Sequence, residues 1–229
     1  MQKIFIFFLF LFLFSFTQEK TEQVQQQLPP GFVYLSDYFT GFKLDLRYAS
    51  ANNFVGKPIK GYQDKVCIVT ESCAKQLKRL NKELEKYDLT ILIYDAYRPQ
   101  QAVNHFVRWA KNPLDTLTKE KFYPNIAKKD LFKKGFIASK SRHSSGSTVD
   151  LTLYSLKHGE ILDMGSPYDF FGEKSFVNYQ NLSKEQKYNR LFLQRIMQKY
   201  GFRSYPKEWW HFTLRNEPYR NHYFNFSVK

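Results

Sequence analysis

The sequence contains few cysteines and few histidines. Only two of its 229 residues are cysteine, Cys67 and Cys73, and only five are histidine. Two cysteines cannot form a disulfide framework, and no companion histidine lies near them at metal-ligand spacing. They could still pair as one disulfide in an oxidising compartment, or remain as two buried thiols. A metal site would therefore have to draw on the histidines and on carboxylates.

Acidic residues are also scarce relative to basic ones. Asp and Glu number 21 against 35 Lys and Arg, for a formal net charge of +14. Such an excess can indicate nucleic-acid binding. However, the lysines of the segment 111–135 are mixed with acids, and no basic run interleaved with aromatic residues stands out. We expect no nucleic-acid partner. The basic surface suits association with anionic cell-envelope polymers, or simply solubility.

No apolar run is long enough for an ordinary transmembrane helix. The longest follows Lys3 and extends for about thirteen residues from Ile4, short of the roughly 20 residues that cross a bilayer. A basic start, a short apolar run and a polar continuation are typical of a secretory signal, although an uncleaved anchor is an alternative. We therefore expect a signal peptide at 1–17, a polar linker at 18–30, a folded domain at 31–229, and an exported protein, periplasmic or secreted.

The remaining chain has the length and apolar content of one folded domain. Hydrophobic residues make up 43% of the sequence, which is too many for a disordered chain. Alternation predicts strands at 44–50 and 147–154, and a continuous apolar run predicts a central strand that ends at Asp95. In the second of these strands Asp150 should lie on the face opposite to the core. The last strand signal is "WWHFTL" at 209–214.

Helix signals alternate irregularly with these strands. Thr70 should open one helix, and Pro99 should be the first residue of another. Ser183 and Gln186 form the pattern of a capping box, and the helix that follows should stop at Gly201. Strands and helices follow no strict βαβ rhythm. We therefore predict an α+β single domain, with helices packed on a mainly antiparallel central sheet.

The stretch "SRHSSGSTVD" at 141–150 contains two candidate metal ligands, His143 and Asp150. A catalytic zinc usually has three protein ligands and one open position. Among the other histidines His211 stands out, because it ends "EWWH" and follows Glu208 by three residues. Glu208 is then a candidate general base for a water molecule activated by the metal. The small residues 144–147 would leave room for a substrate, whereas the alternative for such a stretch is a surface turn.

Five separated segments together carry a family resemblance. The pattern S-x-H-x-x-G-x-x-x-D, followed about sixty residues later by E-x-W-H, resembles the zinc D,D-peptidases, a group that includes dipeptidases, carboxypeptidases, endolysins and the Hedgehog domain. Within this group the segments are most similar to the D-alanyl-D-alanine dipeptidases of the VanX type. The segments are "LRYASANNFVGKPIKGY" (46–62), "IYDAYRPQQAV" (93–103), "SRHSSGSTVDLTL" (141–153), "DMGSPYDFF" (163–171) and "EWWHFTL" (208–214).

The resemblance implies a Hedgehog-like or D,D-peptidase-like fold and the zinc-dependent hydrolysis of the dipeptide D-Ala-D-Ala to two D-alanines. Carried over by position, it implies one zinc ion held by His143, Asp150 and His211, with Glu208 as the general base. It adds a role that spacing alone does not reveal, since the matching arginine stabilises the oxyanion. It also implies groups that bind the two ends of the substrate. These added residues are Arg98 for the oxyanion, Asp169 and Tyr48 for the ammonium group, and Ser141 and Ser144 for the carboxylate end.

Two alternatives remain open at the level of sequence. One is a D,D-carboxypeptidase or endolysin that acts on peptidoglycan stem peptides. Such an enzyme must leave the amine end of its site open, which Asp169 would close. The other is a non-catalytic zinc-containing wall-binding module, which has no chemical need for Glu208 or Arg98. An exported dipeptidase would meet dipeptide released from the wall, which favours turnover or scavenging.

Overall fold

The computed structural model of the protein describes residues 27–229. The expected signal peptide 1–17 and residues 18–26 of the expected linker lie outside the described residues. Leu28 already packs against an aromatic cluster, and the Tyr219 hydroxyl donates to the carbonyl oxygen of Pro30 at 2.8 Å. Within the described residues, native contacts therefore begin slightly before the boundary expected at residue 31.

A mainly antiparallel sheet forms the centre of the fold. Its strand order is β2-β4-β5-β8-β7, with β6 paired to β5. Among residues 27–229, the edge pair β2–β4 is the only parallel strand pair of this sheet, so the predicted α+β architecture is confirmed. A separate two-stranded sheet pairs β1 with β3. The strands are β1 (Phe32–Tyr34), β2 (Lys43–Leu44), β3 (Ile68–Thr70), β4 (Leu89–Asp95), β5 (Thr148–Ser155), β6 (Glu160–Ile161), β7 (Phe202–Tyr205) and β8 (Glu208–Leu214).

The two longest helices begin where the sequence indicates. The Thr70 side chain accepts a hydrogen bond from the backbone N–H of Cys73 and caps α2, and the capping box of Ser183 and Gln186 opens α5. Pro99 is the residue before α3 rather than its first residue. The α-helices are α1 (Leu35–Tyr38), α2 (Glu71–Leu84), α3 (Gln100–Lys111), α4 (Lys119–Phe122) and α5 (Lys184–Lys199).

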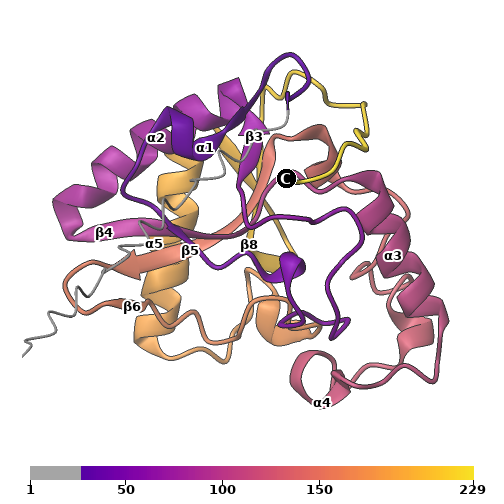
Figure 1. Ribbon diagram of the computed structural model, residues 1–229. Coiled ribbons are helices and arrows are strands. Elements are labelled where there is room, and N and C mark those ends of the chain that lie inside the picture. Colours follow the sequence, from indigo (N-terminus) through magenta and orange to yellow (C-terminus); the bar gives the residue numbers. More distant parts are fainter. Residues whose placement is uncertain (1–26) are drawn as a thin grey trace, which may run out of the picture.

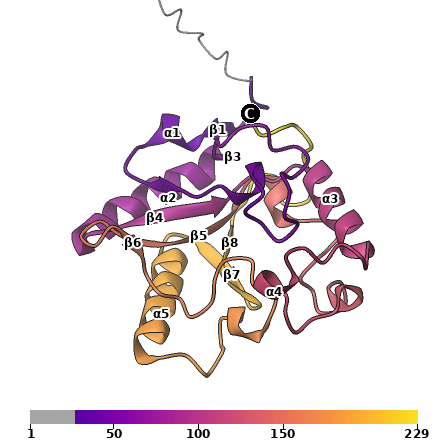
Figure 2. The ribbon, with the colours of Figure 1, turned by 60° about the horizontal axis from the view of Figure 1, so that its bottom comes forward.

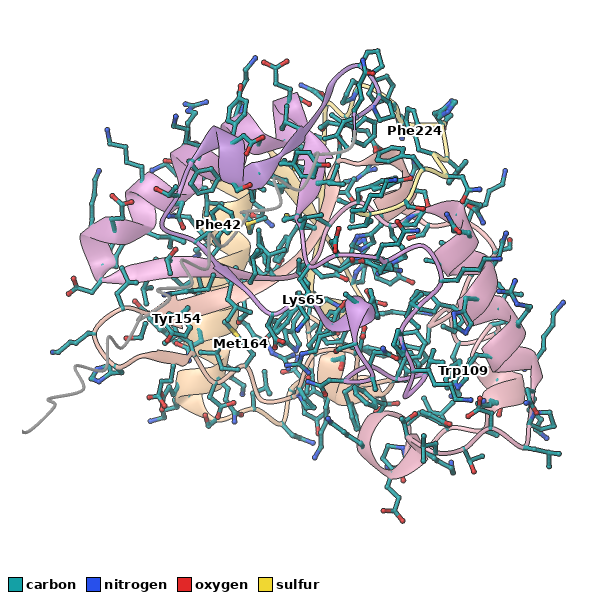
Figure 3. The ribbon with its side chains drawn as sticks, in the orientation of Figure 1. Phe42, Lys65, Trp109, Tyr154, Met164 and Phe224 are labelled. Carbon is teal, nitrogen blue, oxygen red and sulfur yellow. The ribbon has the colours of Figure 1, made fainter. Side chains whose placement is uncertain are left out.

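The helices lie on two sides of the sheet. In Figure 1 and Figure 2, α2 runs beside β4 and α5 lies on the same side, while α3 and α4 lie together on the other side of the sheet. In Figure 3, Trp109 lies on α3 close to α4. The Lys128 ammonium group is 4.0 Å from the centre of the Trp109 ring. Among residues 27–229, no helix combines the length and apolar character needed to span a membrane.

Strand β5 is buried on both faces. Val149, Leu151 and Leu153 are fully buried in the core, as their alternation predicts. Asp150 and Thr152 on the opposite face are also buried, with exposed fractions of 2% and 0%. That face is therefore covered by other parts of the chain, and its carboxylate lies inside the protein.

The prediction of a strand at 44–50 is wrong for most of this segment. Only Lys43–Leu44 pair with β4, and Arg47–Ala49 form a short 3-10 helix. The Arg47 Nε donates to Asp45 Oδ2 at 2.7 Å, and the turn places the Tyr48 side chain in the core. Alternation of apolar residues cannot distinguish this arrangement from a strand. The partly exposed edge strand β7 was not predicted.

The two cysteines are free, buried thiols, so the disulfide alternative is not realised. Cys67 immediately precedes β3, and Cys73 lies in the first turn of α2. Burial raises the pKa of both thiols, which disfavours the reactive thiolate. Their role in the fold is therefore packing.

Candidate metal centre and active site

Three elements bring the predicted metal ligands together. His143 lies in a 3-10 helix, Arg142–Ser145, while Asp150 of β5 and His211 of β8 are direct partners in the antiparallel register. The Asp150 Oδ1 atom is 3.2 Å from His143 Nε2 and 3.1 Å from His211 Nδ1. The two ring nitrogens are 3.2 Å apart. The three donor atoms thus form a nearly equilateral triangle.

The triangle has the size that a zinc ion requires. With zinc–ligand bonds of about 2.0–2.1 Å, two ligands of a tetrahedral site lie about 3.3 Å apart. In the described part of the chain, no hydrogen bond reaches the buried Oδ1 atom of Asp150. His143 Nδ1 is 2.7 Å from the carbonyl oxygen of Ala96, an arrangement that orients the ring and leaves Nε2 available to a metal. The residues therefore fit a tetrahedral metal with one open position.

The electrostatics of Asp150 and His143 also suit a cation. Burial alone would raise the pKa of Asp150, but the imidazoles of His143 and His211 outweigh it and lower the pKa. Burial lowers the pKa of His143 despite the opposing effect of Asp150. A deprotonated carboxylate and a neutral imidazole are the forms that bind metals.

Glu208 lies beside this group at the start of β8. Its Oε2 atom is 3.4 Å from His211 Nδ1. Burial, opposed mainly by His211, raises the pKa of Glu208 to about 7. A carboxyl group with a pKa in this range can both accept and release a proton near neutrality. The position and the pKa both suit the predicted general base.

Arg98 lies three residues after the end of β4 and is fixed by Asp95, a carboxylate that is not among the predicted site residues. Asp95 Oδ2 accepts from Arg98 Nε at 2.9 Å and forms an ion pair with Nη2 at 2.8 Å. Asp95 also accepts a 2.6 Å hydrogen bond from Tyr62. The guanidinium carbon lies over the rings of Tyr48 and Phe106, at 5.1 and 5.2 Å from the respective ring centres. The signal that could have identified Asp95 is its position, three residues before Arg98 and at the end of a buried strand.

Asp169 and Tyr48 form a second polar group in the same site. The Tyr48 hydroxyl donates to Asp169 Oδ2 at 2.9 Å. Burial, and then the charge of Asp150, raise the pKa of Asp169 well above its usual value. Tyr168 connects this group to the metal ligands, because its hydroxyl donates to Asp150 Oδ2 at 3.0 Å and lies 3.1 Å from the Tyr48 hydroxyl. Tyr168 was not predicted from sequence.

These side chains surround one cavity of about 240 Å³. Its apolar wall is formed by residues such as Phe54, Phe106 and Phe171. His143 is almost fully buried beside the cavity. The predicted residues that line the cavity are Tyr48, Arg98, Ser141, Asp150, Asp169, Glu208 and His211.

The small residues 144–147 do not serve the role expected of them. Ser144 is fully buried and is not part of the cavity lining, so its position does not fit a substrate contact. Gly146 has a φ of +79°, and a Cβ atom there would lie 2.2 Å from Phe32 Cε1. Ser147 Oγ is 2.7 Å from Thr70 Oγ1. The small side chains make room for the protein's own packing rather than for a substrate.

The sequence as a whole matches one known protein family. The profile of the family described as Peptidase_M15, D-ala-D-ala dipeptidase, matches residues 29–229. The chain belongs to the D-Ala-D-Ala dipeptidase family. Among proteins named D-alanyl-D-alanine dipeptidase, that of Enterococcus faecalis is 44% identical over 86% of this chain and 98% of its own length.

Other D-Ala-D-Ala dipeptidases show similar coverage. The Streptomyces coelicolor protein is 39% identical over 86% of this chain and 98% of its own length, and the Escherichia coli protein is 33% identical over 80% and 83%. A solved structure of a variant of the vancomycin resistance D,D-pentapeptidase VanY, in complex with Zn(II), is 12% identical. It covers 69% of this chain and 78% of its own, with a TM-score of 0.40.

Proposed function

We propose that this chain uses one zinc ion, held by His143, Asp150 and His211, to hydrolyse the free dipeptide D-Ala-D-Ala to two D-alanines. The observation that carries the proposal is a single cavity lined by two members of the donor triangle, by Glu208 and by a separate buried carboxylate, Asp169, with His143 buried beside it. Membership of the dipeptidase family supports the same reaction.

The side chains divide the chemical work. When bound, zinc would supply Lewis-acid polarisation and lower the pKa of water. Glu208 accepts a proton from the attacking water and passes it to the leaving amine as the C–N bond breaks. Arg98 stabilises the carbonyl oxygen as it becomes negative, and Asp95 and the rings of Tyr48 and Phe106 hold its guanidinium group in place. The products are two free amino acids.

Asp169 and Tyr48 provide a reason for selecting a dipeptide. A carboxylate in a buried site forms a charge-assisted hydrogen bond with a free ammonium group, whereas an acylated nitrogen carries no charge. Asp169 is 6% exposed and Tyr48 is 2% exposed. A carboxypeptidase would need this end open for the rest of a stem peptide. The burial of both residues therefore favours a dipeptidase over that alternative.

A comparison of free D-Ala-D-Ala with N-acetyl-D-Ala-D-Ala tests the proposal. We expect release of D-alanine from the free dipeptide only, and loss of this activity when a chelator removes the metal. Glu208→Gln should retain zinc but lose nearly all turnover, while Glu185→Gln on the exposed face of α5 serves as the matched control. Equal rates on both compounds would instead support the carboxypeptidase alternative, and full activity in Glu208→Gln would exclude Glu208 as the base.

We also propose that the chain is exported through residues 1–17 and that its basic surface associates with anionic envelope polymers. The support is the order of basic, apolar and polar residues at the start of the sequence, and the net charge of +14. The proposed export is tested by recovering the protein from the extracytoplasmic fraction and measuring its mass. Full-length protein confined to the cytosol would contradict it.

A further inference from the structure

A second, smaller cavity continues the active site past His211. It has a volume of about 220 Å³, and its lining includes Arg142, Tyr205 and His211, which also line the larger cavity. Besides His211, this lining contains two charged side chains, those of Arg142 and Arg203. This side of the site is therefore basic, in contrast to the acidic group formed around Asp169.

Arg142 is held in place by a buried carboxylate. Its Nη1 atom is 3.3 Å from Glu217 Oε1, and it also donates to the carbonyl oxygen of Arg220. The Glu217 side chain is 1% exposed, and its Oε2 atom accepts a 2.7 Å hydrogen bond from Ser145. Arg203 approaches the same Oε1 atom at 3.6 Å. Two guanidinium groups share one carboxylate, so a net positive charge remains beside the cavity.

The acidic and basic groups are connected to the donor triangle through different residues. Hydrogen bonds run from Asp169 through the hydroxyls of Tyr48 and Tyr168 to Asp150. Asp150 Oδ1 in turn faces His143, the residue that follows Arg142 in the chain. A zwitterionic dipeptide with its peptide bond at the metal would direct its ammonium group toward Asp169. Its carboxylate would then point toward the basic side of the site.

We propose that Arg142, positioned by Glu217, binds the terminal carboxylate of the substrate. The inference rests on the proposed dipeptidase function and adds a specificity-determining residue to it. The Arg142 side chain is 36% exposed, so it is accessible to a ligand yet restrained by its partners. A guanidinium group offers several donors in a fixed plane, so Arg142 can bind a second carboxylate while Nη1 remains near Glu217.

The test compares D-Ala-D-Ala with its C-terminal amide, D-Ala-D-Ala-NH₂. The wild-type protein should hydrolyse the free acid with the higher kcat/KM. In Arg142→Gln, kcat/KM for the free acid should fall about 10- to 100-fold, as expected for a lost hydrogen bond between charged groups, while the value for the amide stays within about twofold. Glu217→Gln should raise KM for the free acid with little change in kcat or zinc content.

Arg203→Gln is the matched control, because Arg203 contacts the same carboxylate but lines only the smaller cavity. It should keep the preference for the free acid. Equal wild-type kcat/KM values for acid and amide would overturn the inference even if no variant folds, and so would an equal loss on both compounds in Arg142→Gln. Absence of hydrolysis of either compound by zinc-loaded wild-type protein would overturn the proposed function itself, and the inference with it.

Discussion

The side chain of Asp169 is buried against the Tyr48 hydroxyl, 2.9 Å away, and its backbone has a φ of 61°. Aspartate tolerates this left-handed conformation better than most residues. In the free protein, however, a charge at this position has lost most of its hydration, and the pKa is raised accordingly. A residue that suits ligand binding therefore reduces the stability of the unliganded fold.

Asp169→Asn should stabilise the metal-free protein above neutral pH. Because the folded-state pKa is raised, the wild-type protein loses stability as pH rises from about 4 through that pKa, whereas an amide does not titrate. Thermal melts at pH 8 should show a higher melting temperature for the variant, by about 2–4 °C for each kcal/mol regained, and the gap should close near pH 4. The same variant should lose its preference for free over N-acetylated dipeptide.

Asp163→Asn provides a control of opposite sign. Hydrogen bonds from Gln186 and from the backbone N–H of Gly165 lower the pKa of Asp163. The stability that this residue contributes is present at neutral pH and is lost as pH falls through the lowered pKa. Its variant should therefore melt below the wild-type protein at pH 8. A lower melting temperature for Asp169→Asn under the same conditions would contradict a buried charge at position 169.

At the scale of elements, the 3-10 helix Arg142–Ser145 holds His143 between two other parts of the chain. The Arg98 backbone N–H donates to the carbonyl of His143 at 3.3 Å, and the Phe224 N–H donates to the carbonyl of Ser144 at 3.0 Å. Phe224 lies in the C-terminal segment (Figure 3) and packs edge-to-face on Phe32. The turn that carries His143 is thus built onto an aromatic cluster.

Gly146→Ala should disrupt this turn. The new Cβ atom would meet Phe32 Cε1, and Phe32 is already packed against the rings of Tyr97 and Phe226. Overpacking and left-handed strain together should cost about 2–4 kcal/mol in urea unfolding and reduce zinc retention. Gly159→Ala, with a φ of +73° and its nearest neighbour at 3.8 Å, should incur only the strain of about 1 kcal/mol. Equal losses in both variants would show that packing on Phe32 is unimportant.

The three side chains of the donor triangle could be singled out from the sequence because each one lies in a segment with a recognisable pattern. His143 and Asp150 share one short stretch, and His211 ends a strand signal. The function of the small residues 144–147 was missed, since the contact of Gly146 with Phe32 joins residues 114 positions apart. Tyr168 was missed for the same reason. A tyrosine in a loop carries no local sign that its hydroxyl will meet a ligand carboxylate from β5.

At the scale of the whole molecule, the metal centre joins separate parts of the sheet and its connections. A turn after residue 140, the middle of the sheet and its penultimate strand each supply one side chain of the candidate metal site. A bound ion contributes to global stability because it binds the folded protein and not the dispersed ligands of the unfolded chain.

Removal of the metal should lower the melting temperature substantially. At an ion concentration about 1,000 times the dissociation constant, binding contributes about 4 kcal/mol, which corresponds to a shift on the order of 10 °C for a chain of this size. Thermal melts with and without chelator measure the shift, and added zinc should restore it. His105→Ala should respond as the wild-type protein does, because His105 Nδ1 accepts from the Lys60 backbone instead. His211→Ala should show little response, and an unchanged melting temperature in chelated wild-type protein would argue against a bound metal.

The C-terminal residues have a practical consequence for handling the protein. The Val228 backbone exchanges hydrogen bonds with Gly61 and Gln63, and the Phe224 carbonyl accepts from the N–H of Gln100 at the start of α3. Tyr34 donates to the carbonyl of Lys229 at 2.7 Å. A purification tag fused directly after Lys229 would disturb these contacts, and deletion of the last six residues would remove them. Affinity tags should therefore not be fused at the C-terminus.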